Sequence, residues 1–138
     1  MNNLYDIDFN LWSKKQAQLL RDGKFKELDL EHLIEEIEEL GKSEYKTCRS
    51  YTILIIIHLL CLRYWDEEKQ YNEKHWNREL YNFRLLLKKN LSTSIQNKLM
   101  ENWVKIYQEA AQDFNKKTGL IAPQDCPFLV EDVLEDNI

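Results

Sequence analysis

The stretch DLEHLIEEIEELGKSEYKTCRSYTILIIIHLLCLRYW, residues 29–65, decides the fold. Its apolar residues recur at helical spacing, and at about 100° per residue the same phase continues beyond Gly41. The pattern therefore predicts one long helix over about 30–65. A kink at Gly41 is the alternative, because glycine inside a helix costs about 1 kcal/mol relative to alanine. The stripe consists of Leu30, Leu33, Ile34, Ile37, Leu40, Glu44, Cys48, Tyr51, Ile55, His58, Leu59 and Leu62.

The composition of the whole chain also favours helices. The 138 residues are 43% hydrophobic and 31% charged, and they include only three glycines and two prolines. This balance excludes collagen-like and disordered chains, and it argues against a many-stranded sandwich, whose hairpins need turn-forming residues. A chain of this length is expected to form a single domain, residues 1–138.

Three further helices and a short one are predicted around the long helix. The first begins after the cap Asp8 and ends near Asp22, with Gly23 as its stop signal. The others cover about 73–89, about 94–117 after a cap at Ser92, Thr93 or Ser94, and 128–134, while 66–72 is predicted to be a loop. The expected fold is an all-α, antiparallel, up-and-down four-helix bundle with the 120–138 tail packed on it.

Several classes of location and partner are disfavoured. Three widely spaced cysteines without a CxxC pair indicate reduced thiols and a cytoplasmic protein. We expect no membrane association, because the most apolar run, Ile53–Leu62, is half the length of a membrane span and the N-terminus lacks a signal-peptide pattern. The net charge of −5 makes nucleic-acid binding unlikely. Such binding would need one basic face built from Lys14, Lys15, Arg21, Lys24 and Lys26.

Two polar residues, Glu44 and His58, recur at the same helical spacing as the apolar residues of the long helix. His58 is interpreted either as a buried imidazole with a structural hydrogen bond or as a general base or metal ligand. Glu44 needs a partner if it is buried, and Arg84 or Arg49 could supply one. The structural interpretation is an ion pair that fixes helix register. The functional alternative is a polar pocket of Glu44, His58 and Arg84, with Gln16 or Tyr107 nearby.

No metal site or cofactor is expected. Di-iron bundles use a Glu-x-x-His spacing, but Asp29, Ile55 and Asn72 precede the three histidines by three residues. The acidic run at residues 35–39 is interpreted as a solvated face. The chain contains no phosphate-binding glycine loop, nucleophile elbow or HExxH motif.

Several short blocks of the chain together resemble a known bacterial family. The most specific is Glu35-Glu36-Ile37-Glu38-x-Leu40-Gly41-Lys42-Ser43-Glu44. It is accompanied by Tyr5-Asp6-x-Asp8-Phe9 with Trp12, by Gln16-Ala17-x-Leu19-Leu20-Arg21, by His58-Leu59-Leu60, by Tyr107-x-x-Ala110, by Thr118-Gly119-Leu120 and by Cys126-Pro127. Nearly the whole chain thus resembles the family catalogued as domain of unknown function 29, which is common in cyanobacteria. The resemblance implies an all-helical bundle and no established activity.

The chain departs from that family's pattern at two places. Lys117 stands where the family usually has glutamate, and Leu91-Ser92-Thr93 replaces a typical Pro-Ser-Leu.

The leading functional hypothesis is a cytoplasmic, non-enzymatic protein that binds another protein or itself. The alternative is an enzyme or a small-ligand or metal site around the buried Glu, His and Arg residues.

Overall fold

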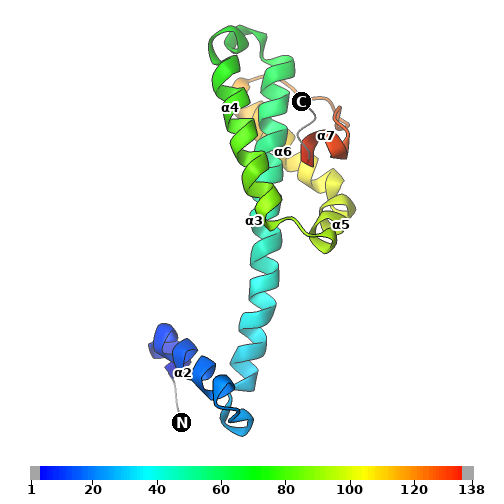
Figure 1. Ribbon diagram of the computed structural model, residues 1–138. Helices are drawn as coiled ribbons and strands as arrows, with labels where there is room; N and C mark the ends of the chain where they lie inside the picture. The colour runs from blue at the N-terminus through cyan, green and yellow to red at the C-terminus, as the bar shows by residue number, and fades with distance from the viewer. Residues whose placement is uncertain (1–3, 135–138) are drawn as a thin grey trace. The chain divides into compact units, whose positions relative to one another are not determined.

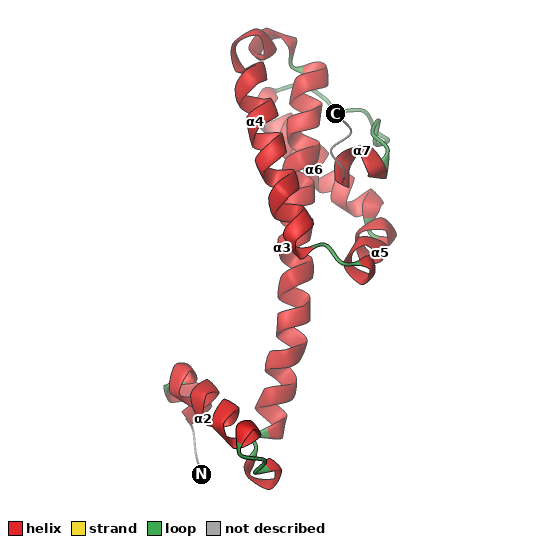
Figure 2. Ribbon diagram, viewed as in Figure 1, coloured by secondary structure: helices red, strands yellow, loops and turns green. Residues whose placement is uncertain are grey.

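The computed structural model describes residues 4–134, and within them every regular element is a helix (Figures 1 and 2). The prediction of an all-α fold is confirmed. The chain divides into two compact units, one ending at Lys42 and the other beginning at Ser43, and we call these the N-terminal and C-terminal units. The elements are α1 (Leu4–Ile7), α2 (Phe9–Arg21), the 3₁₀ helix η1 (Phe25–Glu27), α3 (Leu30–Tyr64), α4 (Asp66–Asn90), α5 (Thr93–Glu101), α6 (Trp103–Thr118) and α7 (Val130–Leu134).

Two predicted helices have the expected bounds. The carboxylate of Asp8 caps α2 by accepting a hydrogen bond from the Leu11 amide at 3.0 Å, and Gly23 follows its end with φ 70°. Helix α3 runs without interruption through Gly41, as predicted from the apolar spacing, which keeps the same helical phase on both sides of this glycine. Gly119 ends α6 in the left-handed conformation, with φ 75°.

Three predicted boundaries were wrong. Residues 66–72 are the first two turns of α4, not a loop, because Asp66, Glu67 and Glu68 favour a helix N-terminus. The helix expected over 94–117 is two helices, α5 and α6, which are separated at Asn102. Ser92 is the cap of α5, and the last helix begins at Val130, two residues later than predicted.

The C-terminal unit has a core to which α3, α4, α5, α6 and α7 all contribute. Trp65, the residue between α3 and α4, stacks its ring on that of Trp76 in α4, with the ring centroids 5.7 Å apart. Helix α7 is held by Arg84, which donates a 2.6 Å hydrogen bond to the carbonyl of Asp132. The largest fully buried apolar side chains are Ile55, Ile56, Leu60, Leu87, Leu99, Ile106, Phe114 and Val133. Residues 135–138 of the predicted tail lie outside the described part of the chain.

Helix α3 is long and apolar enough to cross a membrane by length and composition alone. It is the only such helix among the described residues, and 50% of its most apolar window is buried by the protein itself. A helix in a protein core passes the same test, so this property is weak support for a membrane span.

Replacing Gly41 with alanine should raise the free energy of unfolding by about 1 kcal/mol. Gly41 lies inside α3 without a positive φ, and a Cβ added there meets nothing within 4 Å. The substitution therefore removes backbone entropy from the unfolded chain without creating a clash. Urea denaturation of both proteins measures the change, and an unchanged or lower stability would show that the glycine is needed in the folded state.

Candidate functional site

The buried histidine of α3 is the centre of a polar cluster in the C-terminal unit. His58 is 7% exposed, and its Nδ1 lies 2.8 Å from the carbonyl oxygen of Leu54, one turn earlier. Its Nε2 bonds to one carboxylate oxygen of Glu79 on α4. The other oxygen of Glu79 lies 2.9 Å from Nε2 of His75. Glu79 thus joins two imidazoles, one buried and one exposed.

The hydrogen-bonding partners of His58 define the chemistry of this cluster. Both the Leu54 carbonyl and the Glu79 carboxylate accept hydrogen bonds, so both are satisfied when the ring carries a proton on each nitrogen. Partial burial acts to raise the pKa of Glu79, but the hydrogen bond and charge of His58, with the charge of His75, lower it overall. The arrangement is a contact between an imidazole and a carboxylate that links α3 to α4, and it is an ion pair when His58 is protonated.

Glu79 was not identified from the sequence. It follows Trp76 by three residues and precedes Phe83 by four, so it lies at the edge of the apolar face of α4. The available signal was a carboxylate at the edge of the apolar face of α4 together with a histidine, His58, within the apolar part of α3. The sequence predicted partners for Glu44, namely Arg84 or Arg49, and none for His58 by name.

Four residues of the predicted pocket, all but Glu44, make hydrogen bonds to residues outside the predicted set. Glu44 is exposed, so the expectation that it points inward was wrong. Arg84 donates to the Asp132 carbonyl, and Tyr107 donates a 2.6 Å hydrogen bond to the carbonyl of Pro123. Gln16 belongs to the N-terminal unit, where its side-chain oxygen accepts from the Asp29 amide at 2.8 Å. Within the predicted set, His58 is buried and contacts the carboxylate of Glu79.

Titratable groups near the core show the effects of burial. Burial raises the pKa of the Tyr107 hydroxyl to about 12 and also raises the pKa of the thiols of Cys48 and Cys61. Such thiols are poor nucleophiles, because the thiolate is the reactive form. Within residues 4–134, no three His, Cys, Asp or Glu side chains form a set that could hold a metal ion.

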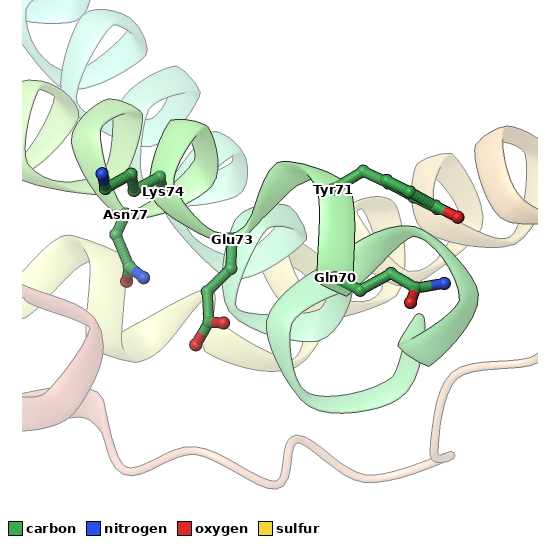
Figure 3. Close-up of a pocket in the computed structure, with 5 residues that line it drawn as sticks. All are labelled: Gln70, Tyr71, Glu73, Lys74 and Asn77. Carbon is green, nitrogen blue, oxygen red and sulfur yellow. The ribbon is translucent and has the colours of Figure 1, made fainter.

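Two hollows on the described surface are small or open. One hollow of about 450 Å³ is lined by Gln70, Tyr71, Glu73, Lys74 and Asn77, and Figure 3 shows that all five side chains come from one stretch of α4. No second element closes it. A cavity of about 210 Å³ beside Tyr107 and Cys126 is smaller than most ligand pockets.

The N-terminal unit is an antiparallel hairpin whose contacts are mostly polar and aromatic. The indole N–H of Trp12 donates to the Asp29 carboxylate at 2.9 Å, and the ring of Tyr5 stacks on that of His32 at 3.9 Å. The Tyr5 hydroxyl also donates to Glu36, and this hydrogen bond raises the tyrosine pKa to about 12. The hydrogen bond between Asp29 and His32 lowers the pKa of the carboxyl group and raises that of the imidazole.

The apolar residues at the start of α3 take no part in these contacts. Leu30, Ile34, Ile37 and Leu40, which we call the apolar stripe, are 59%, 54%, 66% and 68% exposed. The expectation that they lie in a bundle core was wrong, because the hairpin uses the face of α3 that carries His32 and Glu36. Apolar patches exposed on a protein surface occur at protein or membrane interaction sites, in ligand grooves and in aggregation-prone segments.

Comparison with known proteins gives one match. A family model described as "Domain of unknown function DUF29" matches residues 4–138, which is essentially the whole chain. No curated protein and no solved structure matches significantly.

Proposed function

Because this chain belongs to the DUF29 family, a domain family of unknown function, we propose a role for it from its own surfaces: it is a non-enzymatic protein-interaction module. The observation that carries the proposal is the apolar stripe. Its four large aliphatic side chains are each more than half exposed on a single helix. Exposing them to water is unfavourable by about 25 cal/mol per Å², and a protein partner that covers them removes that cost.

The proposed module works in the cytoplasm, and the state of its cysteines supports this part of the proposal. Cys48, Cys61 and Cys126 are all free, which suits a reducing compartment. A small-ligand or enzyme site around Glu44, His58 and Arg84 has weaker support. The hydrogen bonds of His58 lead to Glu79, and those of Arg84 lead to α7.

Purification of the tagged full-length chain from its native host tests the proposed module. We expect the wild-type chain to be recovered with a protein partner, another copy included. The double variant Ile34→Asp/Ile37→Asp should lose that partner, because it places two charges on the apolar stripe. Val104→Asp is the matched control, since Val104 is also an exposed aliphatic residue on a helix, 71% exposed on α6. Repeated recovery of the wild type as a monomer without a partner would contradict the proposal.

A further inference from the structure

The ends of three helices meet at a hollow of about 250 Å³ in the C-terminal unit. Helices α3 and α6 end there at Tyr64 and Thr118, and α4 begins there at Asp66. The walls of the hollow in Figure 3 come from one stretch of α4, whereas the walls of this one come from segments far apart in the sequence. The lining residues are Tyr64, Trp65, Asp66, Glu67, Thr118 and Leu120.

Contacts behind the lining hold both walls in place. The ring of Trp65 stacks on that of Trp76, a core residue that is 5% exposed. On the other wall, the Thr118 hydroxyl donates to the carbonyl of Phe114 at 2.8 Å and accepts from the amide of Leu120 at 3.0 Å. The shape of the hollow is therefore set by the protein's own core and by a hydrogen-bonded turn.

The charged residues that line the hollow are both acidic. Asp66 and Glu67 are exposed, and in the described part of the chain no basic side chain forms an ion pair with either of them. The basic residues next to the lining in sequence have other contacts. Arg63 lies over an aromatic ring of the segment between α6 and α7, and the charge of Lys117 acts on Glu79. The two carboxylates are thus left to attract a cation.

The helix ends add to this negative charge. The last carbonyl groups of a helix lack partners within it, so a helix C-terminus carries a partial negative charge. Both α3 and α6 present such an end to the hollow. The partial positive charge at the start of α4 is outweighed by the three acidic residues of its first turn. The hollow therefore favours a positively charged ligand.

The aromatic and apolar walls indicate which kind of cation fits. The rings of Tyr64 and Trp65 attract organic ammonium ions through their faces, and Leu120 offers an apolar contact to a carbon chain. A cavity of about 150 Å³ holds a benzene molecule, so this hollow accommodates a ligand only somewhat larger. Its volume is below that of most pockets for drug-sized ligands.

We propose that this hollow, which we call the amine site, binds the alkylammonium group of an organic amine. The ammonium group lies against the carboxylates of Asp66 and Glu67, and the carbon chain lies against Tyr64 and Trp65. The amine site is in the C-terminal unit, so it does not depend on the proposed role of the apolar stripe.

Titration with butylammonium chloride tests the amine site in the full-length chain. Nitrogen-15-labelled protein is followed by amide correlation spectra, with sodium chloride at the same concentration as the reference. We expect saturable shifts confined to residues 64–67 and 118–120. Butanol, which has the same carbon chain without the charge, should bind at least about tenfold more weakly. Shifts that do not saturate, or equal binding of butanol, would overturn the proposal.

A second titration identifies the source of the ammonium group. Free amines and lysine side chains both carry it, and Nα-acetyl-lysine amide presents it on a peptide-like backbone. Tighter binding of butylammonium would assign the amine site to a free amine, and tighter binding of the lysine derivative would assign it to a lysine of another protein.

Two double variants separate the amine site from the general charge of α4. Asp66→Asn/Glu67→Gln removes both lining charges and should weaken butylammonium binding at least about tenfold. Glu68→Gln/Glu73→Gln removes as many charges from α4 at positions outside the lining, and it should bind within about twofold of the wild type. Circular dichroism checks that both variants keep the helix content of the wild type. An equal loss of binding in the two variants would overturn the amine site, because non-specific attraction to α4 would then explain the binding.

Discussion

Replacing Phe114 with alanine should lower the free energy of unfolding by about 4 kcal/mol. Phe114 is 0% exposed and is the largest of the fully buried side chains. It lies on α6, and the core it belongs to contains residues from α3, α4, α5, α6 and α7. Its loss removes the buried ring and leaves a cavity that the surrounding helices can close only in part.

Urea denaturation of the full chain, followed by circular dichroism, measures the effect of this substitution. Phe114→Leu should cost less, about 1 kcal/mol, because it keeps most of the apolar volume. Val104→Ala on the same helix is the control, and its 71% exposed side chain should change stability by less than about 0.5 kcal/mol. A loss below about 1 kcal/mol for Phe114→Ala would show that this core is not packed around α6.

Replacing Glu79 with alanine should cost about 2 kcal/mol at neutral pH. The substitution leaves the Nε2 side of the buried His58 without its partner. The cost is below that of breaking a fully buried pair, because the Glu79 side chain is 35% exposed and water screens it. His75→Ala is the matched control, since His75 contacts the same carboxylate from a position that is 58% exposed, and it should change stability by less than about 0.5 kcal/mol.

The contribution of Glu79 should depend on pH. Its pKa in the folded protein is lower than the ordinary value of 4.5, so the unfolded chain binds the proton more tightly. The stabilisation is therefore complete above pH 4.5 and is lost as the pH falls through the folded-state pKa. Urea titrations of wild type and Glu79→Gln should converge as the pH is lowered from 4.5. A constant difference in stability across that range would contradict a charged Glu79.

The long helix shows how much of the fold the sequence could predict. Its apolar phase on both sides of Gly41 predicted one uninterrupted α3, and local signals at Asp8, Gly23 and Gly119 predicted helix ends, because periodicity and caps act within a few residues. The polarity of residues 66–72 predicts a loop, whereas the structure has the first turns of α4 there. Polar residues also form solvated helix turns, and acidic ones stabilise a helix N-terminus.

The candidate surfaces could not be identified from the sequence alone, because they depend on which helices pack against each other. Periodicity identified the apolar stripe but could not show whether another helix covers it. In the structure, Tyr5 of α1 and Trp12 of α2 contact the side of α3 that carries Glu36 and His32 instead. The same limit applies to His58. The sequence indicated that a buried imidazole needs a partner, whereas only the pairing of α3 with α4 identifies that partner as Glu79.

The position of α7 affects how the chain can fold while it is being synthesised. Val133 and Leu134 are 0% and 2% exposed, and Arg84 bonds to a carbonyl 48 residues further along the chain. The ribosome holds the most recently made segment in its exit tunnel, so the nascent C-terminal unit leaves part of its core open to water until Leu134 has emerged. Helices α3 and α4 are therefore translated before the segment that completes their core. During this interval the nascent chain is most exposed to aggregation and to chaperones.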